Sequence, residues 1–302
     1  MKAFEANRLR LDYRDEFKRV TMSPASRFNS LEQRYENNNM LLFTGEAVLL
    51  LKRQGLLIET DFEDAVDAFK SCETVPGLYQ RHPLPYGEGD EELARNGELF
   101  KRDVVSHDEY NGVMYACAAF PELRDTLAVD VVEYGEENGY EYFDVYPNTS
   151  YAKEFLKSPI SVLRDTIKMF KLMHEKQEYR ALVGIAEGLT QKRQKRDIAF
   201  YKIMSSKHSP SLFETLYLAA STIMTTKKPV NYKHNSGRMM ALYRMWAIEE
   251  VGHKSLILKL AHKYFRRKCK QQFGENYVNE LHRFFFKRDI EHPFNSLTEG
   301  MK

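Results

Sequence analysis

The sequence is poor in cysteine and tryptophan and contains no long apolar run. Its 302 residues include one tryptophan and three cysteines, which are far apart. This cysteine pattern fits neither a disulfide framework nor a metal site, so we expect reduced thiols, no metal and no cofactor. No stretch of about 18 apolar residues is present, and the first residues hold no apolar signal segment. We therefore expect no membrane span and no secretory leader.

Strand-like alternation of apolar and polar residues is almost absent, whereas helical spacing recurs along most of the chain. Apolar residues repeat every three or four positions over the ranges 107–120, 159–176, 212–223 and 237–271, whereas the range 39–54 is apolar on nearly every side. This period is that of an α-helix with one buried side. The pattern predicts an all-α fold of antiparallel helix hairpins, arranged as a bundle or as an incomplete (α/α) toroid.

The chain divides into three parts by composition. Residues 1–36 are polar and weakly patterned, which indicates an N-terminal arm. Residues 37–292 hold the periodic segments and are expected to form one helical domain, while 293–302 are expected to be a flexible tail. Within the domain, the Pro- and Gly-rich range 76–105 predicts a long connection, and long connections are often functional or disordered.

The net charge of +2 conceals a strong asymmetry along the chain. Residues 51–150 hold 22 acidic and 8 basic residues, whereas residues 151–302 hold 14 acidic and 29 basic residues. Such a chain can pair head to tail with its own copies, can place its basic half on nucleic acid, or can fold so that the two halves face each other.

Polar residues gather where the long connection ends and a helix is expected to begin. Ser106 and Glu109 fit the capping box, in which each side chain bonds to the backbone of the other. His107 and Asp108 would occupy the first turn, where the helix dipole favours an acid. The alternative is that both face a pocket, with Asp108 as a general acid or base and His107 as a substrate-binding residue.

Three further residues are candidates for the same site. Glu46 is an acid inside a helix that is apolar on nearly every side, so it is either paired in the core or exposed to an internal cavity. Tyr79 and Arg81 lie in the long connection and could contact an anionic or sugar ligand. The alternative for both is a packed surface loop.

Two patterns stand out in the C-terminal part. Glu250 and His253 have the Glu-x-x-His spacing of di-iron helical bundles, but no second copy of the motif is present, so we expect no metal there. The range 259–270 is a basic amphipathic helix. Its charges predict either a solvated face or contact with nucleic acid, through Lys259, Lys263, Arg266 and Arg267.

The order of motifs in residues 37–120 resembles a set of uncharacterised proteins of tailed bacteriophages. The motifs are the apolar helix with its internal Glu46, then Pro76-Gly77-Leu78-Tyr79-Gln80-Arg81, then Ser106-x-Asp108-x-x-x-Gly112. These proteins are similar in general look to the (α/α) toroids of glycoside hydrolases and polysaccharide lyases. The resemblance implies that Glu46, Tyr79, Arg81 and Asp108 lie near one mouth of a helical ring. The chain departs from these toroids because it has a single tryptophan, Trp246, and shows no clear aromatic platform for a sugar.

Three functions remain open from the sequence. The first is a virion-associated structural or accessory protein, made in the host cytoplasm, that binds itself or other virion proteins. The second is a polysaccharide hydrolase or lyase with Glu46 and Asp108 as carboxylates, which must lie about 5–10 Å apart for glycoside hydrolysis. The third is a nucleic-acid-binding protein that uses the basic C-terminal half.

Overall fold

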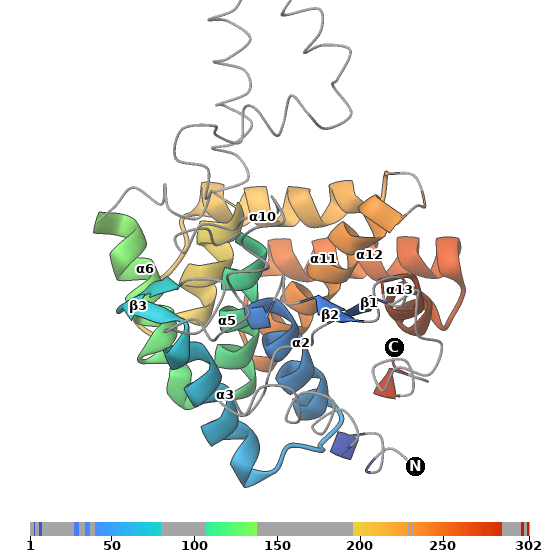
Figure 1. The fold of residues 1–302 in the computed structure, drawn as a ribbon. Coiled ribbons are helices and arrows are strands. Elements are labelled where there is room, and N and C mark those ends of the chain that lie inside the picture. Colours follow the sequence, from blue (N-terminus) through green and yellow to red (C-terminus); the bar gives the residue numbers. More distant parts are fainter. Residues whose placement is uncertain are drawn as a thin grey trace, which may run out of the picture.

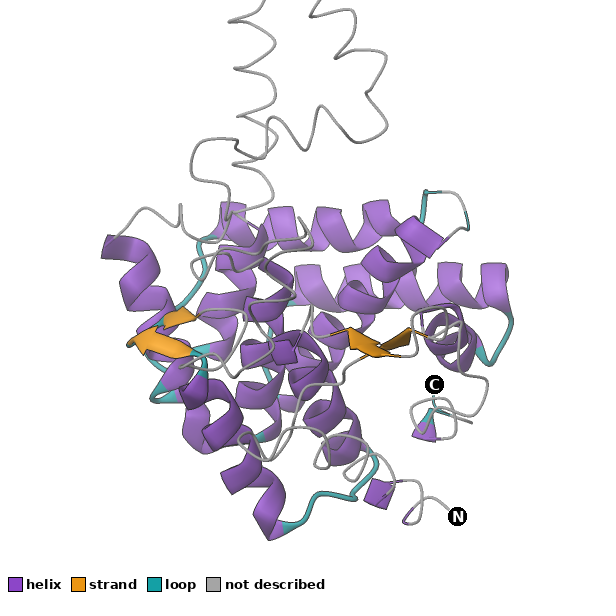
Figure 2. Ribbon diagram, in the orientation of Figure 1, coloured by secondary structure: helices purple, strands orange, loops and turns teal. Residues whose placement is uncertain are grey.

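The computed structural model describes residues 3, 6–7, 27–29, 34–36, 40–79, 107–137, 196–228, 230, 232–285, 297–298 and 301. These residues form an all-α fold, as predicted, with two small two-stranded sheets (Figures 1 and 2). The finer prediction of an incomplete toroid stays a prediction. Among the described residues, no helix combines the length and the apolar character needed to cross a membrane.

The helices and strands follow one another along the chain with short connections where both ends are described. The helices are α2 (Met40–Arg53), α3 (Glu59–Ser71), α5 (His107–Ala119), the 3-10 turn η1 (Pro121–Arg124), α6 (Leu127–Glu137), α10 (Leu212–Thr225), α11 (Tyr232–Glu250), α12 (Leu256–Phe273) and α13 (Tyr277–Phe285). Residues 196–204 are also helical. The strands are β1 (Arg27–Asn29) paired with β2 (Arg34–Glu36), and β3 (Glu73–Val75) paired with β4 (Leu78–Tyr79), both antiparallel.

Helices α2 and α5 form the centre of the core. Residues 41–51 of α2 and 109–120 at α5 are buried on every side, which confirms the prediction of a helix buried all round at 39–54. Helix α11 packs against both. Its buried aromatic residues continue the core through ring contacts from Tyr115 to Tyr243, 5.5 Å apart, and from Tyr243 to Trp246, 5.1 Å apart.

Helices α2 and α11 end in the same kind of turn, and glycine makes both possible. Gly55 and Gly252 each have a φ of 66°, a left-handed conformation that glycine adopts without strain. At each turn the amide of the glycine and the amide of the residue after it donate to carbonyls of the last helical turn, as in a Schellman motif. The periodic range 237–271 is compatible with one long or one broken helix, and the turn at Gly252 divides it into α11 and α12.

Thr60-x-x-Glu63 and Ser211-x-x-Glu214 also have the spacing of a capping box, which predicts a helix start at each. The box at Ser211 is confirmed, since the Glu214 amide donates to the Ser211 hydroxyl at 3.2 Å and the Ser211 amide donates to the Glu214 carboxylate at 2.6 Å. The box at Thr60 is wrong by two residues. Helix α3 begins at Glu59, and its first free amide, that of Ile58, donates to the Asp61 carboxylate at 2.9 Å.

The predicted connection 76–105 begins as a tight hairpin between β3 and β4. Pro76 and Gly77 form its turn, and Gly77 has a φ of 82°, as a type II turn requires at its third residue. Near the other end of the chain, Leu297 and Thr298 of the predicted tail are buried. The Gln54 side chain donates to the Leu297 carbonyl at 2.7 Å, so these two residues are docked on the helical body.

Candidate functional site

The carboxylate predicted on α2 is a core residue. Glu46 is 1% exposed and lies on α2, one of the two central helices of the core. The helix predicted after Ser106 is confirmed, and His107 and Asp108 lie in the first turn of α5. Their side chains, and Ser106 itself, lie outside the described residues, so the separation of Glu46 and Asp108 stays untested.

Tyr79 is also buried, at 1% exposed, and packs inside the molecule rather than at a loop surface. Its ring meets that of Tyr110 edge to face at 5.7 Å, and its backbone amide donates to the Tyr110 hydroxyl at 3.2 Å. Burial raises the pKa of both phenols well above the usual value. Tyr79 therefore joins the β3–β4 hairpin to α5. Arg81 lies outside the described part of the chain.

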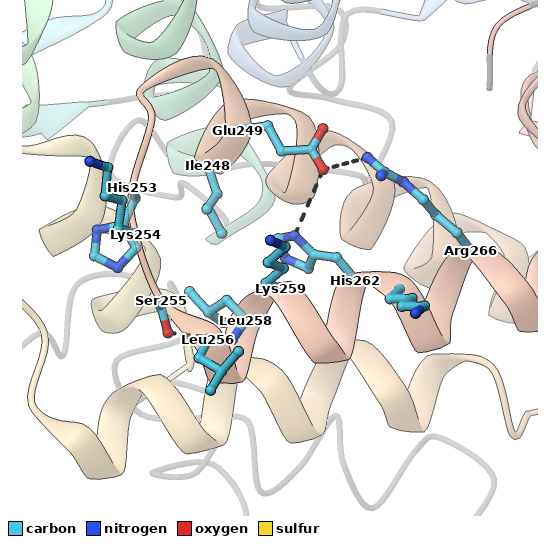
Figure 3. Close-up of a pocket in the computed structure, with 11 residues that line it drawn as sticks. Ile248, Glu249, His253, Lys254, Ser255, Leu256, Leu258, Lys259, His262 and Arg266 are labelled. Atoms are coloured by element: carbon cyan, nitrogen blue, oxygen red, sulfur yellow. Dashed lines mark hydrogen bonds and ion pairs between the residues drawn. The ribbon is translucent and has the colours of Figure 1, made fainter.

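A pocket opens between the end of α11 and the first turns of α12 (Figure 3). Its volume is about 760 Å³, which is in the range of small-molecule sites. The apolar part of its lining comes from Ile248, Leu256 and Leu258. Six of the other lining residues are basic and one, Glu249, is acidic; the basic ones are His253, Lys254, Lys259, His262, Lys263 and Arg266. The pocket therefore combines an apolar wall with an excess of positive charge.

The acid in this pocket is held by its basic neighbours. Arg266 donates to the Glu249 carboxylate, and Nδ1 of His262 lies 4.0 Å from it (Figure 3). A guanidinium nitrogen of Arg53 lies 3.6 Å from the same carboxylate. Burial and, to a smaller extent, the charge of Arg266 together lower the pKa of His262 to about 4, so the ring is neutral at pH 7. The lysines of the pocket then supply its unbalanced positive charge.

Exposed apolar side chains gather on α10 and α12, which lie side by side (Figure 1). The four most exposed large apolar residues of the described chain all belong to these two helices: Phe213 at 73%, Leu256 at 71%, Leu212 at 63% and Leu260 at 59%. Leu216 and Met224 of α10 are exposed as well. We call these six residues the α10–α12 surface. Exposed apolar groups in this density mark an interaction site more often than single ones do.

Basic residues run along the exposed side of α12. Lys259, Lys263 and Arg267 are exposed and follow one another at intervals of four residues, which places them on one side of the helix. In the part of the chain that the structure describes, none of the three forms an ion pair, whereas Lys270 pairs with Glu275 at 2.6 Å. We call these three residues the basic ridge. Arg266, predicted as a fourth member, turns instead toward Glu249.

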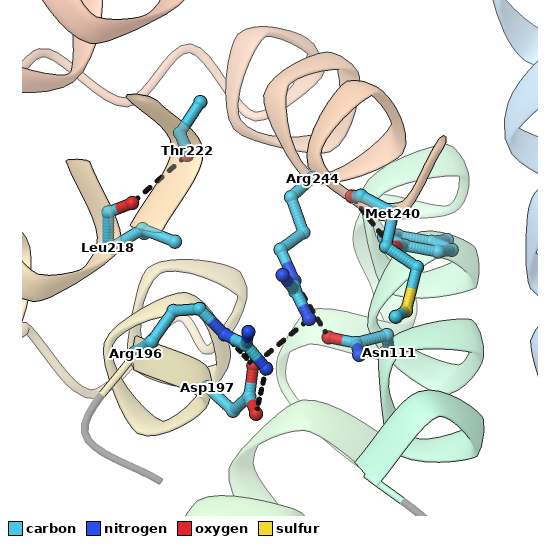
Figure 4. Close-up of polar contacts among 8 residues, drawn as sticks. Asn111, Arg196, Asp197, Leu218, Thr222, Met240 and Arg244 are labelled. Carbon is cyan, nitrogen blue, oxygen red and sulfur yellow. Dashed lines mark hydrogen bonds and ion pairs between the residues drawn. The ribbon is translucent and has the colours of Figure 1, made fainter. Parts of the chain in front are cut away.

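A buried polar cluster joins α5, α11 and the helical segment 196–204 (Figure 4). Asp197 accepts two hydrogen bonds from Arg196, at 2.7 and 2.6 Å, and lies 3.0 Å from the guanidinium of Arg244. Arg244 also donates to the Asn111 side chain at 3.2 Å. Asn111, Asp197 and Arg244 are each less than a twentieth exposed. Because the charges pair with one another away from solvent, this cluster has a structural role and holds the three segments together.

Glu250 and His253, which have the Glu-x-x-His spacing, do not lie on one face of a common helix. Helix α11 ends at Glu250, and the turn at Gly252 redirects the chain before His253. Over the described ranges, no group of three His, Cys, Asp or Glu side chains lies close enough to hold a metal ion.

The sequence missed two features of this region. The helical period of the range 212–223 predicts that Leu212 and Leu216 belong to its buried side, but α10 buries Thr215, Leu218, Ala219 and Thr222 instead. The buried Arg244 was also overlooked, although a charged residue inside the apolar run 239–248 is a signal that it must find a partner in the core. Comparisons of the chain with models of protein families, with curated proteins and with solved structures give no match.

Proposed function

We propose that this chain is a structural or accessory protein that acts by binding other protein chains through the α10–α12 surface. The observation that carries the proposal is the exposure of Phe213, Leu212, Leu256 and Leu260 on two adjacent helices. Fully burying one such side chain contributes about 1.5–3 kcal/mol, so four together can support a specific interface. The basic ridge beside them would restrict which partners fit.

The setting that we propose for this binding is the virion of a tailed bacteriophage, assembled in the host cytoplasm. Support for the setting comes from the resemblance of residues 37–120 to such proteins. An enzyme that acts on polysaccharides is not proposed, because Glu46 and Tyr79 are buried and a polymer must reach the carboxylate that cleaves it.

Photo-crosslinking from the α10–α12 surface tests the proposal. A photoreactive phenylalanine analogue replaces Phe213 in cells that make the protein, and a matched control carries it at Glu137, an exposed residue of α6. We expect a discrete protein adduct from position 213 that is absent from position 137 and is lost in a Leu216→Ser background. An adduct of equal yield at both positions, or none at position 213, would overturn the proposal.

A second candidate function is binding to nucleic acid, favoured by the basic ridge, of which Lys259 and Lys263 also line the pocket, and by Lys254 of the same pocket. Three phosphate contacts predict that the logarithm of the binding constant falls with the logarithm of salt concentration with a slope of about −3. Fluorescence anisotropy with a labelled DNA duplex measures this slope. Replacing Lys263 with Gln should reduce it by about 1, and an unchanged slope would remove this candidate.

A further inference from the structure

Helix α3 carries an acidic counterpart of the basic ridge. Glu59, Glu63 and Asp67 are exposed and also follow one another at intervals of four residues. Within the described residues, none of the three takes part in an ion pair. We call them the acidic ridge. Asp61, which caps α3, is buried and lies on another side of the helix, so the ridge is separate from the residues that hold the helix in place.

The two ridges match in spacing and in sign. Residues four apart on an α-helix are about 6 Å apart along its axis. The charges at 59, 63 and 67 on α3 and at 259, 263 and 267 on α12 therefore have the same period. Two helices with these ridges can lie along each other so that each acid meets a base.

The ridges cannot meet within one molecule. Helices α3 and α12 lie at different ends of the fold, with α2 and α5 between them (Figure 1). We propose that the basic ridge of one copy binds the acidic ridge of the next copy, head to tail. This inference rests on the proposed function and names its partner, a second copy of the chain. A contact between two different surfaces repeats from copy to copy, so it produces rings or filaments rather than a closed dimer.

Apolar residues beside both ridges can contact each other between two copies when the charged ridges are aligned. Leu256 and Leu260 flank the first base of the basic ridge, and Ile58, 48% exposed, precedes the first acid of the acidic ridge. Exposed ion pairs contribute little affinity on their own, because water and salt screen them. The apolar side chains therefore provide most of the attraction. The ridges fix the register of the two helices and make the association depend on salt.

A charge exchange between the two ridges tests the inference. One variant reverses the charge of the basic ridge with Lys263→Glu and Arg267→Glu. The other variant reverses the charge of the acidic ridge with Glu63→Lys and Asp67→Lys. Glu59 is left unchanged because an acid in the first helical turn stabilises α3. All four sites are exposed, so both variants should fold, which far-ultraviolet circular dichroism and thermal unfolding confirm.

Sedimentation velocity at low salt measures the association. We expect the wild type to associate with rising concentration, each variant alone to remain monomeric, and an equimolar mixture of the two variants to associate again. About tenfold more salt should weaken the association of the wild type and of the mixture alike. The inference is overturned if either variant alone associates as the wild type does, or if the mixture stays monomeric.

Failure of this inference and failure of the proposed function give different results. If the wild type is monomeric while position 213 still yields a discrete adduct with another protein, the self-association is wrong and the protein-binding function stands. If no adduct forms at position 213 and the charge-exchanged mixture still associates, the ridges bind copies of the chain but the apolar surface of α10 is not the docking site.

Discussion

Gly45 of α2 and Gly112 of α5 bring the backbones of the two central helices into direct contact. A Cβ atom on Gly45 would lie 1.9 Å from the carbonyl oxygen of Gly112, and one on Gly112 would lie 2.0 Å from the carbonyl oxygen of Leu41. No side chain fits at either position. The distance between packed helices depends on the side chains at their contact, so this pair of glycines sets how closely α2 and α5 approach.

Replacing Gly112 with alanine should destabilise the protein strongly. The added methyl group meets backbone atoms, which cannot rotate away as a flexible side chain could. We expect the free energy of unfolding to fall by at least about 2 kcal/mol, the scale of an overpacked core. Urea unfolding followed by circular dichroism measures the change.

Gly237 of α11 provides the control for this variant. Apart from its chain neighbours and the nearby backbone of its own helix, no atom lies within 4 Å of the Cβ that an alanine would add there. Alanine is favoured over glycine in a helix by up to about 1 kcal/mol, so Gly237→Ala should be neutral or stabilising. A similar loss of stability in both variants would show that helical glycines, and not the close contact of α2 with α5, determine the result.

Much of the fold was predictable because single helices carry their own signals. The apolar circumference of α2, the capping box at Ser211 and the glycine at residue 55 each act within a few residues, so the sequence displays them. The contact of Gly45 with Gly112 joins positions far apart in the chain. A glycine inside a helix hints at a close approach but does not say which segment approaches it.

The exposed side of α10 was not predictable for a different reason. Apolar residues occupy most of the circumference of the segment 212–225, so periodicity cannot select the side that faces the core. The neighbouring helix decides it, since α12 packs against α10 and leaves Leu212, Phe213 and Leu216 in solvent. The candidate surface therefore became visible only when the tertiary packing was known.

Two leucines of α12 test the assignment of its buried and exposed sides. Leu258 is 1% exposed and Leu260 is 59% exposed, although they are two residues apart. Leu258→Ala should lower the free energy of unfolding by about 2–5 kcal/mol, as is typical of core leucines. Leu260→Ala should change it by less than about 0.5 kcal/mol. Equal effects in urea unfolding would mean that α12 is rotated relative to this structure.

The ion pair between Asp197 and Arg244 should be strongly coupled. Asp197→Ala leaves the guanidinium of Arg244 buried without its carboxylate, and we expect a loss of about 3–5 kcal/mol. Arg244→Met should cost less, because Asp197 keeps both hydrogen bonds from Arg196.

A double-mutant cycle measures this coupling. In the variant with both Asp197→Ala and Arg244→Met, residue 244 no longer carries a buried guanidinium, so the loss of stability should be smaller than the sum of the two single losses. Losses that simply add would show that the two side chains contribute independently.

His282 should make the protein sensitive to mild acid. The ring lies between the Tyr243 hydroxyl, 2.9 Å from Nε2, and the Val278 carbonyl, 2.8 Å from Nδ1. Because a carbonyl only accepts, Nδ1 carries the proton and Nε2 accepts from the tyrosine. Burial lowers the pKa of His282 from 6.5 to about 4, which is also the value for His262.

The direction of the pH effect follows from these two lowered pKa values. As pH falls from 6.5 toward 4, the unfolded chain takes up protons on both rings while the folded chain does not. The free energy of unfolding should therefore be fully retained above pH 6.5 and fall below it, by up to about 1.4 kcal/mol per pH unit for each ring. Urea unfolding at a series of pH values between 7 and 5, a range above most carboxylate titrations, measures this slope.

A pair of variants on α13 separates proton linkage from simple weakening of the helix. His282→Gln removes one of the two rings whose pKa is lowered to about 4, so the slope of stability against pH should become shallower by up to about half. Leu281→Ala, at the neighbouring buried position, removes no titrating group and should lower stability by the same amount at every pH. If His282→Gln keeps the wild-type slope, the buried ring is not the source of the acid sensitivity, and the remaining lowered pKa values, those of His262 and His253, must account for it.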